Sequence, residues 1–191
     1  MNDQEFAQGQ SFAEYLAAMK ENRRRVERIY QEISLSDSQR TELASVVSEL
    51  GGLNIVFIAE DWCGDAAMVL PFLARMGEEP GVKLRCFVRS QHPELIPAGV
   101  KVIPVVRFFD PTWHELGQFI ERSQSAHQRV KEFKAAHPEM AALQASTAPE
   151  DQEKLREVFR GLLGQMENWY REGLYQETLA EMLAAIRGVA R

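Results

Sequence analysis

The stretch of sequence that decides the fold of this chain is Ala59-Glu60-Asp61-Trp62-Cys63-Gly64-Asp65-Ala66-Ala67-Met68-Val69-Leu70-Pro71. A nearly continuous apolar run at residues 53–59 leads into it, which is the pattern of a strand buried on both faces. Residues 64–76 then carry apolar side chains at helical spacing. Cys63 therefore lies in a strand-to-helix turn, where unpaired amides and the positive helix end stabilise a thiolate. The alternative, weighted about equally on location alone, is a small buried hydrophobic side chain.

Three further strands are expected after this turn. Residues 82–88 alternate in polarity, residues 103–109 form an apolar run, and residues 115–120 can pair back as a hairpin after the turn at Asp110 and Pro111. The order of strand, helix, strand, connection and hairpin predicts an α/β fold with a mixed sheet.

Helices are expected on both sides of this core. The apolar residues of 11–33 share one helix face, and Ser11 with Glu14 forms a capping box. A second helix is predicted to begin at Ser36, with Gln39 completing its capping box, and to end at Gly51.

The C-terminal part is predicted to be helical, with one interruption. Residues 125–137 form a helix, and residues 137–149 are expected to be a loop. Thr147 and Glu150 offer a capping box for the following helix, which Gly173 is expected to break.

Two motifs resemble the thioredoxin family. Residues 62–66, Trp-Cys-Gly-Asp-Ala, with Met68 and Pro71, look like the thioredoxin active-site segment Trp-Cys-Gly-Pro-Cys. Residues 99–106, Gly-Val-Lys-Val-Ile-Pro-Val-Val, are similar to the thioredoxin segment that carries a cis-proline at the start of a strand. The resemblance covers about residues 48–135.

The resemblance implies a thioredoxin-like mixed sheet with added N-terminal and C-terminal helices in one domain. Residues 1–50 form the N-terminal helices, 51–135 the thioredoxin-like core and 136–191 a C-terminal helical extension. It also implies a site in which Cys63 is the catalytic nucleophile. Trp62, Gly64 and Asp65 support it, while Ile103 and Pro104, joined by a cis bond, line the groove for the partner chain.

The chain departs from dithiol thioredoxins in two ways. Ala66 replaces the second cysteine, and the buried acid that thioredoxins often carry is absent from the run Val56-Phe57-Ile58. The motif resembles a bacterial branch of thioredoxin-like proteins with a single active-site cysteine. The favoured function is therefore a monothiol redox protein, in which the Cys63 thiolate attacks a disulfide or an oxidised thiol, forms a mixed disulfide and is released by an external thiol such as glutathione.

The alternative is a redox-silent binding or scaffold module on the thioredoxin fold, because fold does not fix function. Trp169 and Tyr170 in the helical extension are then candidates for a partner or homodimer surface. The pKa of Cys63 distinguishes the two functions. A near-neutral value supports a redox protein, and a value above that of free cysteine favours the scaffold. The helix end lowers this pKa and the Asp65 carboxylate raises it, so the sequence leaves the sign open.

Composition and residue patterns argue against several other classes of protein. The 191 residues carry 22 basic and 28 acidic side chains, a net charge of −6 that argues against nucleic-acid or anionic-membrane binding. No apolar run reaches the roughly 20 residues of a membrane span, and the first residues lack a signal-peptide pattern, so a cytoplasmic protein is expected. No cofactor or metal is expected, because the two cysteines and four histidines lack metal-ligand spacing.

Three weaker candidates have structural explanations that outweigh functional ones. Cys86 is interpreted as core packing within a strand, and Glu60 and Asp61 as caps of a strand end rather than proton relays. The basic run of Arg23-Arg24-Arg25 with Lys20 and Arg28 is interpreted as a solvated helix face, with a phosphate site as the less favoured alternative.

Overall fold

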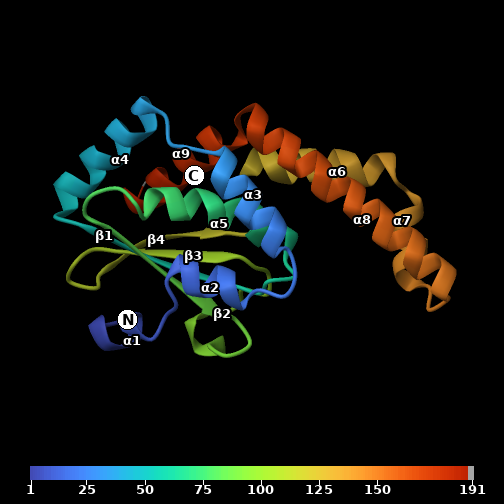
Figure 1. Ribbon diagram of the computed structural model, residues 1–191, viewed down its shortest axis with the longest axis horizontal. Coiled ribbons are helices and arrows are strands. Elements are labelled where there is room, and N and C mark those ends of the chain that lie inside the picture. Colours follow the sequence, from blue (N-terminus) through green and yellow to red (C-terminus); the bar gives the residue numbers. More distant parts are fainter. Residues whose placement is uncertain (189–191) are drawn as a thin grey trace. The chain divides into compact units, whose positions relative to one another are not determined.

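The computed structural model describes residues 1–188 (Figure 1). The last three residues of the C-terminal extension that was expected at 136–191 therefore lie outside the described residues. The chain divides into two compact units. One contains residues 1–122 together with residues 178–188, and the other contains residues 123–177.

The first unit is built on a mixed sheet of four strands in the order β2-β1-β3-β4. The strands are β1 (Leu53–Ala59), β2 (Val82–Val88), β3 (Val105–Phe109) and β4 (Glu115–Ile120). β1 pairs parallel with β2 and antiparallel with β3, and β3 pairs antiparallel with β4. Every residue of β1 is buried, as expected for a strand covered on both faces. The predicted α/β class and all four strands are confirmed.

Helix α5 (Gly64–Met76) follows β1 directly and is buried along nearly its whole length. The helices that precede β1 are α1 (Asp3–Ala7), α2 (Phe12–Ala18), α3 (Arg23–Glu32) and α4 (Asp37–Leu50). Two of the three predicted capping boxes are present, at Ser11 and at Ser36. Gly51 ends α4 in the left-handed conformation, with φ 75°, which glycine adopts without steric cost.

The expectation of one helix over residues 11–33 is wrong, because the chain breaks between α2 and α3. Asn22 has a φ of 53°, and α3 begins there without a side-chain cap. The backbone amides of Lys20 and Glu21 donate to the Asp61 carboxylate instead of to helical carbonyls. A long-range contact thus overrides the local apolar periodicity.

Helix α9 (Tyr175–Ile186) returns the chain to the first unit. Its apolar face is buried through Leu179, Met182, Leu183 and Ile186. Ala185 approaches β4 so closely that a Cβ on Gly117 would collide with the Ala185 carbonyl.

The second unit is helical throughout. It contains α6 (Gln124–Ala136), α7 (Glu139–Ala145), α8 (Pro149–Trp169) and a π-helical turn (Tyr170–Leu174). The loop expected at residues 137–149 is wrong, because the alanine-rich segment has enough helix propensity to form α7. The Thr147 capping box is also wrong, since Ala148 is the N-cap of α8 and supplies no side-chain bond. The predicted break at Gly173 is confirmed by its φ of 139°.

A short 3-10 helix (Pro93–Leu95) completes the connection from β2 to β3. Among residues 1–188, no helix combines the length and the apolar character that a membrane crossing requires.

Candidate functional site

Cys63 occupies the junction between β1 and α5. It is the N-cap residue of α5, with φ −74° and ψ 120°, so its backbone is extended rather than helical. Its amide donates to the Glu60 carbonyl at 3.1 Å, and its carbonyl accepts from the Ala67 amide at 3.1 Å. These two bonds fix the turn, and the side chain is 7% exposed.

The cis-proline segment lies directly against this sulfur. The Cys63 thiol donates to the Ile103 carbonyl, with Sγ and oxygen 3.4 Å apart. The Ile103–Pro104 peptide bond is cis, as predicted from the resemblance. Two motifs forty residues apart in sequence therefore meet at one point in the fold.

Burial is the largest influence on the Cys63 thiol and raises its pKa above the ordinary value. The amide of Ala66 opposes this, because it bonds the thiolate at the start of α5. The Asp65 carboxylate raises the pKa, whereas the Asp65 amide and the Arg122 guanidinium lower it. Burial outweighs the helix end, so the sign left open by the sequence is upward. This direction by itself is the one expected of a redox-silent module.

Asp65 is held by a salt bridge that the sequence did not reveal. Arg122 binds both oxygens of its carboxylate, with Nε 2.7 Å from Oδ1, and both side chains are largely buried. A second carboxylate, that of Glu121, lies 2.7 Å from the same guanidinium. The salt bridge therefore places the positive Arg122 guanidinium beside the negative Asp65 carboxylate, close to Cys63. No local pattern links residues 65 and 122.

Two large apolar side chains next to the site in sequence are exposed. Trp62 is 56% exposed and Val102 is 42% exposed, and each directly precedes a residue of the site. Trp62 also lines an open hollow together with Glu60, Arg89, Ser90 and Pro93. Exposed large apolar side chains of this kind offer a contact surface for another molecule.

The acids before Trp62 have structural partners. Glu60 accepts from the Ser90 amide at 2.7 Å, and Asp61 accepts from the Lys20 amide at 2.7 Å. Glu60 thus caps a backbone group just after the end of β2, as interpreted, whereas Asp61 caps the break between α2 and α3 and not a strand end.

Cys86 lies in the core of the first unit. It is fully buried on β2, and burial raises the pKa of its thiol far above the ordinary value. Its backbone exchanges two hydrogen bonds with Gln10. Within residues 1–188, no group of three acidic, cysteine or histidine side chains is placed to hold a metal ion.

Comparison with known proteins defines the class. The chain matches the thioredoxin family over residues 9–134, about two thirds of its length, and belongs to that family. The match takes in the N-terminal helices α2 to α4, which the two motifs alone had left outside the resemblance. No curated protein matches the chain.

Two solved structures share the fold over nearly the whole chain. A protein of unknown function from Pseudomonas aeruginosa is 17% identical, with a TM-score of 0.60, and the match covers 97% of this chain and 96% of that one. An HIV epitope scaffold is 18% identical, with a TM-score of 0.59 and full coverage of both chains.

Proposed function

We propose that the protein is a monothiol redox protein that performs thiol–disulfide exchange through a mixed disulfide on Cys63. The observation that carries this proposal is the position of the Cys63 sulfur, 3.4 Å from the Ile103 carbonyl and beside cis-Pro104. A partner chain laid along this segment brings its disulfide next to the sulfur, and the exposed Trp62 and Val102 add apolar contact.

The exchange proceeds in two steps. The Cys63 thiolate attacks one sulfur of a disulfide, a new disulfide forms to Cys63, and the other sulfur leaves as a thiolate that takes up a proton. Ala66 supplies no sulfur for an internal second attack. An external thiol such as glutathione therefore attacks the mixed disulfide, takes over the partner sulfur and restores the Cys63 thiol.

The raised thiol pKa sets the pH dependence of the first step. Thiolate is the attacking form, and its fraction increases as the pH approaches the pKa from below. We therefore expect slow exchange at neutral pH and a rate that rises throughout the range from pH 7 to pH 9. In this proposal the turn at Gly64 and the Asp65–Arg122 salt bridge position the sulfur.

The substrates in this proposal are oxidised proteins or the disulfide of a small thiol such as glutathione. The cytoplasm is the compartment that fits, because it supplies reduced glutathione and keeps isolated cysteines as thiols. A bacterial origin fits the single-cysteine motif. A homodimer through the C-terminal helices stays a proposal, tested by light scattering. Tyr170 is buried and does not belong to such a surface, whereas Phe159 on α8 is partly exposed.

The test is single-turnover reaction with a neutral aromatic disulfide, 4,4′-dithiodipyridine, followed by its released thione between pH 6 and pH 10. Wild type and Cys86→Ala should each release one equivalent in a phase that accelerates with pH, and Cys63→Ser should lack this phase. Mass spectrometry should find the mixed disulfide on Cys63, and glutathione should then remove it. Absence of the Cys63 phase even at pH 10 would establish the redox-silent alternative.

A further inference from the structure

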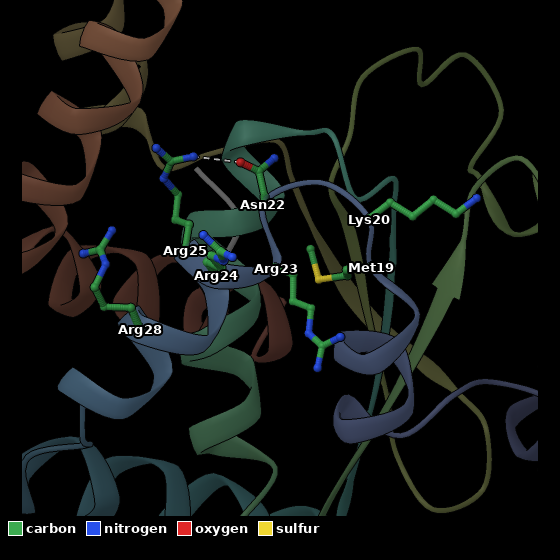
Figure 2. A pocket seen from close by; sticks show the side chains of 7 residues that line it. All are labelled: Met19, Lys20, Asn22, Arg23, Arg24, Arg25 and Arg28. Carbon is green, nitrogen blue, oxygen red and sulfur yellow. Dashed lines mark hydrogen bonds between the residues drawn. The ribbon is translucent and has the colours of Figure 1, made fainter.

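Five basic side chains gather on one surface of the first unit. Lys20, Arg23, Arg24, Arg25 and Arg28, here called the basic cluster, line one open hollow together with Met19 and Asn22 (Figure 2). The cluster lies at the break between α2 and α3. It is a local concentration of positive charge on a chain whose net charge is −6.

This surface is fixed to the segment that carries Cys63. The amides of Lys20 and Glu21 donate to the Asp61 carboxylate at 2.7 and 3.2 Å. The Asn22 side chain donates to the Asp61 carbonyl at 2.9 Å. Asp61 precedes Cys63 by two residues, so a molecule bound at the basic cluster lies beside the active-site turn.

Among residues 1–188, Lys20, Arg23 and Arg24 take part in no ion pair, so the charge of these three members of the cluster is not neutralised by the protein. Arg25 donates to the Asn22 side chain at 2.8 Å, and Arg23 donates to the Ala17 carbonyl at 3.5 Å. The Ala17 carbonyl is neutral, so its hydrogen bond leaves the charge of Arg23 in place. Arg28 lies 3.9 Å from Glu32, and both of those side chains are nearly half exposed, so solvent weakens their attraction.

Helix stability does not explain the position of these arginines. Arg23, Arg24 and Arg25 form the first turn of α3, and no acid accompanies them there. Positive charge at this end opposes the helix dipole, and Asn22 provides no side-chain cap. A sequence that breaks a local stability rule at an exposed site is expected to do so for function.

The directions of the side chains indicate the shape of the ligand. In Figure 2, Lys20 and Arg28 extend to opposite sides of the hollow, and Arg23 points away from Arg25. Groups that diverge in this way do not enclose one compact anion. They suit an extended ligand whose negative charges are distributed along its length.

We propose that the basic cluster binds an acidic segment of the protein whose disulfide is attacked by Cys63. This inference rests on the proposed exchange and specifies its substrate class. Opposite charges on the two surfaces accelerate encounter and orient the partner before the sulfurs meet. The effect must weaken with salt, because exposed charges are screened over about 10 Å at 0.1 M and about 3 Å at 1 M.

The experiment uses three blocked peptides, each with one cysteine activated as a pyridyl disulfide. The cysteine is flanked by glutamate, by glutamine or by lysine. Attack by Cys63 forms a disulfide to the peptide and releases pyridine thiolate, which reports the rate. At low salt the glutamate peptide should react about tenfold faster than the glutamine peptide, and the lysine peptide slower than both. The ratio should approach one at high salt.

Charge-reversal variants locate the effect. Lys20→Glu and Arg24→Glu should each lower the glutamate-to-glutamine rate ratio about two- to fivefold, and this ratio cancels any effect on the Cys63 thiol that the two peptides share. Lys83→Glu is the matched control and should keep the wild-type ratio. Lys83 pairs with Asn54 at the start of β1, so it lies at the other end of the sheet from Cys63. Equal ratios in all variants, or no preference for glutamate in wild type, would overturn the proposal.

A second measurement separates this inference from the exchange itself. Fluorescent peptides with serine in place of cysteine are titrated against Cys63→Ser, and binding is measured by anisotropy. Salt-sensitive binding of the glutamate peptide, lost in Lys20→Glu and kept in Lys83→Glu, supports the docking surface whether or not Cys63 reacts. Binding of inorganic phosphate or of single-stranded DNA in preference to the glutamate peptide would overturn the assignment to an acidic protein segment.

Discussion

Two opposing influences act on the sulfur of Cys63. The amides at the start of α5 favour the thiolate, whereas burial against the Ile103 carbonyl favours the thiol and raises the pKa. Asp65 and Arg122 act on the same sulfur with opposite signs. Because these two side chains form a salt bridge, a change at either one alters the field of the other at Cys63.

The first prediction concerns this salt bridge. Arg122→Gln removes the positive group and should slow iodoacetamide alkylation of Cys63 at pH 8 about three- to tenfold, because the thiolate fraction falls. Asp65→Asn removes the negative group and should accelerate it. Lys83→Gln should match wild type, and circular dichroism verifies that each variant is folded. If Arg122→Gln and Asp65→Asn were both alkylated at the wild-type rate, the salt bridge would have no influence on the Cys63 thiol.

The second prediction concerns which thiol reacts. Cys63 is slightly exposed at a turn, whereas Cys86 is fully buried inside β2. Brief treatment with substoichiometric iodoacetamide should therefore label Cys63 predominantly, as read by peptide mass mapping. Preferential labelling of Cys86 would reverse the site assignment.

At the scale of elements, the junction of β1 and α5 determines what the site can do. Residue 63 has an extended backbone, and the helix begins at Gly64. In a regular helix, Cβ atoms three residues apart are about 5–6 Å apart, too far for the roughly 3.8 Å of a disulfide. The extended N-cap removes this restriction between positions 63 and 66.

The third prediction follows from this geometry. Oxidised Ala66→Cys should form a disulfide with Cys63, leaving Cys86 as the single thiol in a denaturing Ellman titration. Peptide mapping should recover the 63–66 link. Asp65 is kept in this variant, because a proline there would remove a carboxylate that pairs with the largely buried Arg122. Three free thiols after mild oxidation would contradict a thioredoxin-type turn.

The fourth prediction concerns the contact of β4 with α9. Gly117→Ala places a Cβ against the Ala185 carbonyl and should destabilise the protein by about 1–3 kcal/mol. Gly164→Ala on α8 is the control, since nothing lies near that Cβ and alanine should stabilise the helix by about 0.5–1 kcal/mol. Urea unfolding followed by circular dichroism measures both. An unchanged midpoint for Gly117→Ala would show that α9 does not pack closely on β4.

At the scale of the whole molecule, the chain leaves the thioredoxin-like unit after residue 122 and returns to it at residue 178. The returning helix α9 buries four large apolar side chains, and Arg187, directly after the helix, forms an ion pair with Glu42 at 3.7 Å. The C-terminal helices therefore belong to different units. Most of α9 lies in the first unit, whereas α6 to α8 lie in the second.

The fifth prediction tests this division. A chain that stops after Glu177 loses the burial by Leu179, Met182, Leu183 and Ile186. At about 1.5–3 kcal/mol for each side chain, the loss is comparable to the stability of a whole domain. The truncated chain should bind the dye ANS and be rapidly digested by protease. A chain that stops after Gly188 is the control and should resist both, and equal resistance of the two chains would contradict the assignment of α9 to the first unit.

Most of the first unit could be predicted because its signals are local. The apolar run of β1, the helical spacing of α5 and the capping boxes at Ser11 and Ser36 lie within short stretches of chain. The predictions failed for two reasons. Between α2 and α3, the distant Asp61 carboxylate binds backbone amides and breaks the expected helix. In α7, helix propensity forms a helix in a segment that has no helical pattern of apolar residues.

The sequence by itself determined the family, the mixed sheet and the location of a lone cysteine at a strand-to-helix turn, since these depend on residue type and spacing along the chain. The tertiary structure alone decided the upward direction of the Cys63 pKa, the pairing of Asp65 with Arg122 and the attachment of the basic cluster to Asp61. These properties depend on distances between groups far apart in sequence and on how much water reaches them. Both quantities exist only once the chain has folded.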